Sequence, residues 1–227
     1  NRMNREGSNI LTVEDPVEYD LPGVGQTQVN AQIGMTFASA LRAVLRQDPD
    51  IVLVGEIRDA ETASVAVQAA LTGHLVLSTL HTNTGLGAIT RLRDLGVEPF
   101  LLAPTLRGVL AQRLVRLLCT DCRRPVALSG DLRAVFERHG LPVPDRLFDG
   151  GGCTACGGTG YAGRTGLYDV VESTAALKAA IAADASEADL ASSAGVPANG
   201  LFVSGLRAAA AGRTSMAEVL RVVNDTE

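Results

Sequence analysis

The sequence predicts an α/β protein built around a mainly parallel sheet. In the first half of the chain, short apolar segments alternate with amphipathic helical segments, which is typical of strand–helix–strand units. Three candidate strands, 9–13, 50–54 and 75–80, are rich in β-branched and aliphatic residues without strict alternation. This pattern is expected of strands that are covered on both faces. At 227 residues the chain can form one sizeable core with small appendages.

Boundary residues predict helices between these strands. Thr36 can cap a helix over 37–47, whose apolar positions share one face. Asp59 can cap a second helix over 60–72, and Gly73 can end it. The local signals at both ends of these segments therefore agree with the helical spacing inside them.

Two further helices are predicted before the first cysteine. One covers 86–95 and ends at Gly96. Pro104 suits the first turn of the next helix, because proline is tolerated where the amide hydrogen has no partner. Apolar residues continue at helical spacing beyond it: Leu106, Val109, Leu110, Leu114 and Leu117.

The composition changes after this region and predicts three domains. Residues 1–118 form the α/β core, 119–173 a cysteine-containing subdomain, and 174–227 a small helical subdomain. The middle part carries a short predicted helix near 131–139 and a glycine-dense run. The last part consists of four short alanine-rich helical segments, which we attribute to helix propensity rather than disorder.

Composition and charge argue against two functional classes. No apolar run approaches the roughly 20 residues needed to cross a bilayer, and the polar start has no signal-peptide pattern, so we expect a cytoplasmic protein. The formal net charge is −5. Since nonspecific nucleic-acid affinity depends on a basic face, we expect no nucleic-acid partner.

Polar side chains follow each of the three predicted strands. Glu14, Asp15 and Glu18 follow the first strand, Glu56 the second, and His81 the third. Ligands of parallel α/β sheets bind beyond the carboxyl ends of the strands, so these groups should converge on one edge. Carboxylates there can hold the water shell of Mg²⁺ and orient an attacking water, while a histidine can contact a terminal phosphate. The alternative is that the acids cap helices or face solvent.

Three sequence features limit this interpretation. His74 precedes its strand, so from the residues alone a structural role is favoured for it. Gly55 stands where many P-loop ATPases carry a metal-binding aspartate, which moves metal binding to the acids after the first strand. No G-x-x-x-x-G-K-[ST] phosphate loop is found, and Lys178 is the sole lysine.

Two C-x-x-C pairs, Cys119/Cys122 and Cys153/Cys156, are separated by 30 residues. In a chain without secretory features this spacing favours a metal site over disulfides. Four thiolates complete a tetrahedral Zn²⁺ site and leave no open position, so the role should be structural. A redox dithiol and four unlinked cysteines remain as alternatives.

Long ordered motifs resemble one known family. TVEDPVEYD, GVGQTQVN, LRAVLRQDPDIVLVGEIRD, TGHLVLSTLHTN and AQRLVRLLC follow one another as in the secretion ATPase superfamily. Within it, the chain is similar to the assembly ATPases of bacterial type II secretion and of type IV pili. GVGQTQVN and GLGAITRLRDLGVEPFLL are closer to the type II secretion members.

The resemblance implies a RecA-like P-loop ATPase core with a zinc subdomain and a C-terminal helical region. Residues 12–18 match the family's aspartate box, 48–59 its Walker B segment and 73–83 its histidine box. It implies that Glu56 is the catalytic carboxylate, that Arg58 belongs to the nucleotide site, and that the acids at 14–18 serve Mg²⁺. It also implies that His81, together with His74, couples the phosphate state of bound ATP to conformation.

The resemblance further implies a homo-hexameric motor, peripheral on the cytoplasmic face of the inner membrane. Its partners would be the inner-membrane platform and the cytoplasmic domain of a secretion-system membrane protein. The four-cysteine module is typical of assembly rather than retraction ATPases. The start NRMNREGS resembles the end of the helix that follows the phosphate loop, so the chain is expected to begin just past that loop and to bind nucleotide weakly. A RecA-like DNA translocase and a non-enzymatic zinc interaction module are the competing functions.

Overall fold

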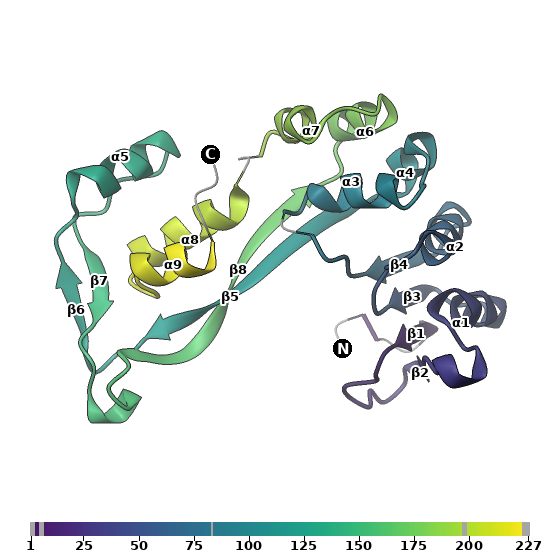
Figure 1. Ribbon diagram of the computed structural model, residues 1–227, viewed down its shortest axis with the longest axis horizontal. Helices are drawn as coiled ribbons and strands as arrows, with labels where there is room; N and C mark the ends of the chain where they lie inside the picture. Colours follow the sequence, from purple (N-terminus) through teal and green to yellow (C-terminus); the bar gives the residue numbers. More distant parts are fainter. Residues whose placement is uncertain (1–2, 5–6, 83, 197–198, 224–227) are drawn as a thin grey trace. The chain divides into compact units, whose positions relative to one another are not determined.

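The computed structural model describes residues 3–4, 7–82, 84–196 and 199–223 (Figure 1). The chain forms two compact units. Unit 1 comprises residues 1–107 and 173–193, and unit 2 comprises 108–172 and 194–227. Among the described residues, no helix is both long enough and apolar enough to cross a membrane.

Unit 1 is organised around a four-stranded parallel sheet in the order β2-β1-β3-β4. The strands are β1 (Ile10–Glu14), β2 (Gly25–Gln28), β3 (Ile51–Val54) and β4 (Leu75–Ser78). The parallel sheet and the three expected strands are confirmed. The sequence reading missed β2, whose residues GQTQ carry no apolar signal.

The burial of the strands follows their place in the sheet. Val13, Val52 and Val54 of the two central strands are completely buried. In contrast, β4 has half-buried and exposed residues, and Leu77 is 40% exposed. The expectation that all three strands are covered on both faces is therefore wrong for β4, because this strand lies at an edge of the described sheet.

Helices α1 (Phe37–Val44) and α2 (Ala60–Leu71) begin where their caps predict. The Thr36 hydroxyl accepts a hydrogen bond from the Ser39 amide, and the Ser39 hydroxyl accepts one from the Thr36 amide. Asp59 accepts a hydrogen bond from the Thr62 amide at 2.8 Å. The remaining helices of unit 1 are α3 (Gly87–Asp94), α4 (Pro99–Thr105), α6 (Ala175–Ala182) and α7 (Glu187–Ala194).

The helix expected to start at Pro104 does not exist. Pro104 lies inside α4, which begins at Pro99, and the following residues form the long strand β5 (Gly108–Leu118). Val109, Ala111, Arg113 and Val115 alternate with more exposed residues, so the true period is two. Leucines lie on both faces of this strand, so their spacing along the sequence resembled the spacing of an apolar helix face.

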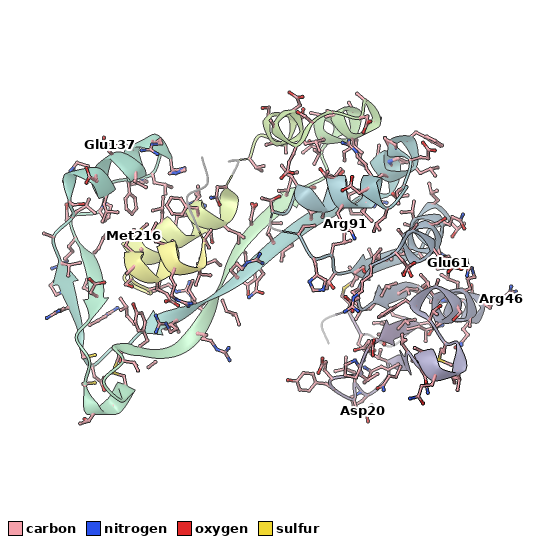
Figure 2. The ribbon with its side chains drawn as sticks, viewed as in Figure 1. Asp20, Arg46, Glu61, Arg91, Glu137 and Met216 are labelled. Atoms are coloured by element: carbon pink, nitrogen blue, oxygen red, sulfur yellow. The ribbon has the colours of Figure 1, made fainter. Side chains whose placement is uncertain are left out.

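Unit 2 is built on an antiparallel ribbon of β5 and β8 (Tyr161–Glu172), in which Gly108 pairs with Glu172 and Leu118 with Tyr161. A second antiparallel pair joins β6 (Arg123–Val126) to β7 (Leu147–Gly150). Helices α5 (Gly130–Arg138), α8 (Gly200–Ala210) and α9 (Met216–Val222) complete the unit, and Met216 is labelled in Figure 2. Its core contains Phe136, Phe202 and Leu206.

The helix predicted near 131–139 and the four expected after residue 174 are all present. The two units divide the chain at other positions than the three predicted domains, since residues 108–118 belong to unit 2 and α6 and α7 to unit 1. The functional division into a core, a zinc subdomain and a helical subdomain stays a prediction.

Candidate active site and metal centre

A cavity lies at the carboxyl edge of the parallel sheet in unit 1. Its volume is about 460 Å³. Glu14 is the last residue of β1, while Glu56 and His81 lie just beyond the ends of β3 and β4. The lining residues are Glu14, Asp15, Pro16, Glu18, Phe37, Leu53, Gly55, Glu56, Arg58, Thr79 and His81. The structure thus brings together six of the seven residues that the sequence assigned to this site.

Glu56 is largely enclosed, with a side chain only 12% exposed. Its Oε2 lies 3.2 Å from Nε2 of His81 and is also contacted by Nε of Arg58. The His81 imidazole itself is 83% exposed. The carboxylate is therefore oriented by one guanidinium and one imidazole, and it remains at the wall of the cavity.

Glu14 is held from two sides. Its Oε1 accepts hydrogen bonds from the Thr12 hydroxyl and from Nε2 of Gln26, the latter at 2.9 Å. The Oε1 of Gln26 also accepts the Leu21 amide at 2.8 Å. Gln26 therefore ties the acidic loop after β1 to β2. The sequence reading missed this residue, because its position beside Glu14 depends on the pairing of β2 with β1.

Gly55 lies where β3 approaches β1 closely. The Gly55 amide donates to the Val13 carbonyl at 2.7 Å, and its own carbonyl accepts the Thr79 hydroxyl at 2.6 Å. A Cβ at this position would lie 3.2 Å from the Val13 oxygen and 3.4 Å from Cα of Glu14. A side chain here would push against the β1 backbone, which gives a steric reason for glycine. Thr79 was not anticipated from the sequence.

His74 lies outside this cavity. Its Nδ1 lies 2.9 Å from the Ala69 carbonyl and 3.1 Å from the Thr72 hydroxyl, so the ring is fastened to the end of α2. It precedes β4, whereas His81 follows this strand. The predicted role of His74 at the nucleotide stays a prediction, and the hydrogen bonds support the structural role that the residues alone favoured.

The four cysteines of unit 2 form one cluster. Their sulfur atoms lie within 4.8 Å of one another, and the separations Cys119–Cys153, Cys122–Cys156 and Cys153–Cys156 are 3.9, 3.8 and 3.7 Å. Four thiolates around a tetrahedral ion at about 2.3 Å would lie about 3.8 Å apart. Three of the sulfur separations therefore match those of a tetrahedral metal site.

Glycines allow the cysteine loops to meet. A Cβ at Gly150 would lie 2.5 Å from the Gly160 oxygen. The chain before Cys153 and the chain after Cys156 can therefore come this close only because both positions are glycine. The amides of Cys153 and Gly160 donate to Sγ of Cys156 at 3.3 and 3.2 Å. These are the expected N–H contacts that support a thiolate ligand.

The thiols have contrasting acidities. The Cys153 amide hydrogen bond is the main cause that lowers the pKa of Cys156 to about 6. Burial raises the pKa of Cys122 to about 12, with further contributions from the neighbouring thiols. Near pH 7 the Cys156 thiol is therefore mainly ionised, whereas Cys122 would keep its proton until a metal cation displaces it.

These features define a class of protein: a parallel α/β core with acids and a histidine at its carboxyl edge, joined in one chain to a four-cysteine cluster that could hold a metal ion. The chain belongs to the family described as Type II/IV secretion system protein, which it matches over residues 1–221. This confirms the resemblance found in the motifs.

Similar proteins of known name support this family assignment. The chain is 51% identical over 224 residues to type II secretion system protein E of Dickeya dadantii, covering 99% of this chain and 44% of the relative. It is 50% identical over 224 residues to type II secretion system ATPase E of Vibrio cholerae, with the same coverage. The chain therefore spans less than half the length of these relatives.

Solved structures share the architecture. The pilus retraction motor PilT with bound ADP aligns with a TM-score of 0.68 at 26% identity, covering 99% of this chain and 55% of that one. The ATPase DotB of Legionella pneumophila aligns with a TM-score of 0.61 at 21% identity, covering 93% of this chain and 50% of that one. The predicted secretion-ATPase fold is confirmed.

Proposed function

We propose that a chain of full family length carrying this sequence is the ATP-hydrolysing motor of a type II secretion system, powering pseudopilus assembly and protein export. The supporting observation is the Glu56–His81 pair at the carboxyl edge of the sheet, in a chain about half identical to relatives named type II secretion system ATPase E. The four-cysteine centre favours this assignment over a retraction motor.

In this proposal Glu56 orients the water that attacks the terminal phosphate. Its carboxylate is already positioned by Arg58 and His81, so little reorganisation is needed when substrate binds. The carboxylates of Glu14, Asp15 and Glu18 line the same cavity and are suitable oxygen ligands for Mg²⁺ and its waters. Bound Mg²⁺ would neutralise phosphate charge.

The cavity walls of this chain do not form a phosphate cradle. The carboxylates outnumber the cationic side chains among its lining residues, and the sequence contains no G-x-x-x-x-G-K-[ST] loop. We therefore propose that the 227-residue chain alone binds nucleotide weakly. Hydrolysis by this chain at the rate of a full-length relative would contradict the assignment.

The cysteine centre is proposed to hold Zn²⁺ in a structural role. All four ligand positions would be filled by Cys119, Cys122, Cys153 and Cys156, which leaves none for a substrate or water. The active form is proposed to be a homo-hexamer on the cytoplasmic face of the inner membrane. Its proposed partners are the inner-membrane platform and the cytoplasmic domain of a secretion-system membrane protein.

The decisive experiment replaces Glu56 by Gln in a chain of full family length. ATP hydrolysis should fall by about 10²- to 10⁴-fold because the water loses its positioning base, while nucleotide binding and the oligomer persist. Glu61→Gln is the matched control, since Glu61, labelled in Figure 2, is exposed on α2 and pairs only with Arg42 among the described residues.

The readouts also separate the competing functions. Loss of export in Glu56→Gln supports the type II secretion motor, whereas loss of pili without loss of export would assign a type IV pilus assembly ATPase. DNA-stimulated hydrolysis would favour a RecA-like translocase. Unchanged secretion in the Glu56→Gln variant would leave a non-enzymatic zinc interaction module.

A further inference from the structure

Helix α3 begins just after the loop that carries His81, and it is fastened at both ends to the helix pair α6–α7, about 90 to 100 residues later in the chain. All these elements belong to unit 1. Arg91, labelled in Figure 2, marks α3 in the picture. The ties lie at the two ends of α3, and each uses different chemistry.

The tie at the C-terminal end of α3 is made by Arg93. Its side chain is only 14% exposed, and its Nη1 and Nη2 donate to the carbonyls of Ala185 and Ile181 at 2.7 and 3.1 Å. Nε lies 3.3 Å from Oδ1 of Asp184. The guanidinium thus caps the C-terminal end of α6, where a cation interacts favourably with the unpaired carbonyls.

The tie at the N-terminal end is made by Thr84. Its hydroxyl donates to Oε1 of Glu187 at 2.6 Å and accepts the Gly87 amide at 2.9 Å. Its carbonyl accepts the Thr82 hydroxyl at 2.9 Å. A Cβ at Gly87 would lie 2.8 Å from the Thr84 hydroxyl oxygen, so the glycine permits this close turn. One hydroxyl therefore accepts the first amide of α3 and binds the first turn of α7.

His81 depends on this loop for its position. Within the described part of the chain, the Glu56 carboxylate is the one hydrogen-bond partner of the exposed His81 ring. The backbone that carries the ring is restrained on its C-terminal side through Thr82 and Thr84 to Glu187. Movement of α7 would therefore reach the loop that presents His81 to Glu56.

We propose that Glu187 is a positioning residue for His81, and that the α6–α7 pair transmits its own position to the site through Thr84. This inference rests on the proposed function of Glu56 and His81 in hydrolysis.

The first test needs no activity and uses the 227-residue chain. Amide hydrogen exchange of residues 80–94 is compared between the parent chain and Glu187→Ala. Loss of one hydrogen bond should accelerate exchange at Gly87 and in the first turn of α3 by about two- to tenfold. Glu187→Gln, which keeps an acceptor oxygen, should restore protection.

The matched control is Asp189→Ala. Asp189 lies in the same turn of α7, and its carboxylate accepts only the local Ser186 hydroxyl in the described structure. It should leave exchange around His81 unchanged. Equal acceleration in both alanine variants, or none in Glu187→Ala, would overturn the proposal.

The second test uses a chain of full family length. Glu187→Ala should lower kcat about two- to tenfold while KM for ATP stays within about twofold, and it should have no further effect in a His81→Ala background. Additive losses would show that Glu187 does not act through His81. Absence of any Glu56-dependent hydrolysis in the parent would instead reject the proposed function, and the exchange experiment would still decide whether the tie restrains the loop.

Discussion

Glu218 in α9 offers the sharpest stability prediction, because its carboxylate is completely buried between two arginines. Nη2 of Arg116 donates to it at 2.6 Å and the Arg116 amide at 3.0 Å, while Nε and Nη2 of Arg221 donate at 2.8 Å. The carboxylate thereby joins α9 to β5. These hydrogen bonds, chiefly that from Arg221, hold the pKa of Glu218 far below its ordinary value.

Glu218→Gln should destabilise unit 2 by about 3 kcal/mol, the lower end of the cost of breaking a buried ion pair. The lower end applies because the Arg116 and Arg221 side chains remain 43% and 59% exposed and can regain water. For a chain of this size, this corresponds to a fall in Tm of about 6–12 °C. Urea unfolding at pH 7, followed by circular dichroism, measures it.

The pH dependence has a definite sign. Since the folded pKa is depressed, the contribution of Glu218 is fully present above the unfolded pKa of about 4.3 and is lost as pH falls below it. The slope of unfolding free energy against pH between about 4.5 and 3 should therefore be shallower in Glu218→Gln than in the parent chain. Glu137→Gln is the control, because Glu137 is exposed on α5 (Figure 2). A loss no larger than that of this control would refute the reasoning.

Three further predictions concern the cysteine cluster and the contact of Arg93 with α6. Cys122→Ser should abolish binding of one Zn²⁺ per chain, as measured by elemental analysis of reduced protein, and parent protein without bound zinc would contradict the assignment. Zinc uptake near pH 7 should release protons, detectable with an indicator dye, because the pKa of Cys122 is raised to about 12; uptake should weaken as pH falls through the Cys156 pKa of about 6. Arg93→Met should lower the free energy of unfolding in urea by about 1.5–3 kcal/mol, because the carbonyls at the end of α6 lose charged donors. An unchanged urea midpoint would argue against a stabilising role of Arg93.

The elements with local signals could be predicted from sequence, and those defined by pairing could not. Thr36 and Asp59 fix helix starts through hydrogen bonds within their own turn, so neighbouring residues were sufficient. In contrast, β2 forms because Gly25–Gln28 pairs with β1, and the residues GQTQ alone do not predict a strand. Strand β5 was mistaken for a helix because leucines occur on both of its faces, and its pairing with β8 overrides the apparent helical spacing.

The same distinction holds for the site. Acids and histidines after predicted strands could be placed at one edge because parallel strands end together. Gln26 and Thr79 could not, since each acts by a hydrogen bond to a neighbouring strand or its following loop, and such contacts depend on strand order. The buried position of Glu218 could not be predicted for a related reason. Its main-chain partner on β5 is 102 residues away, and a helix was expected where the β5–β8 ribbon forms.

The close approach of β3 to β1 bears on the proposed roles of the carboxylates in cation binding and in orienting water. With Gly55 against the Val13 carbonyl, a side chain at the position directly before Glu56 would press on the β1 backbone. The nearest carboxylates that can serve a cation then lie on and after β1, where Gln26 from β2 steadies Glu14. Glu56, held on the other side by His81 from the loop after β4, is the carboxylate that we propose acts on water. Strand order β2-β1-β3-β4 thus places the proposed cation ligands and the proposed water-activating carboxylate on different strands around a single cavity.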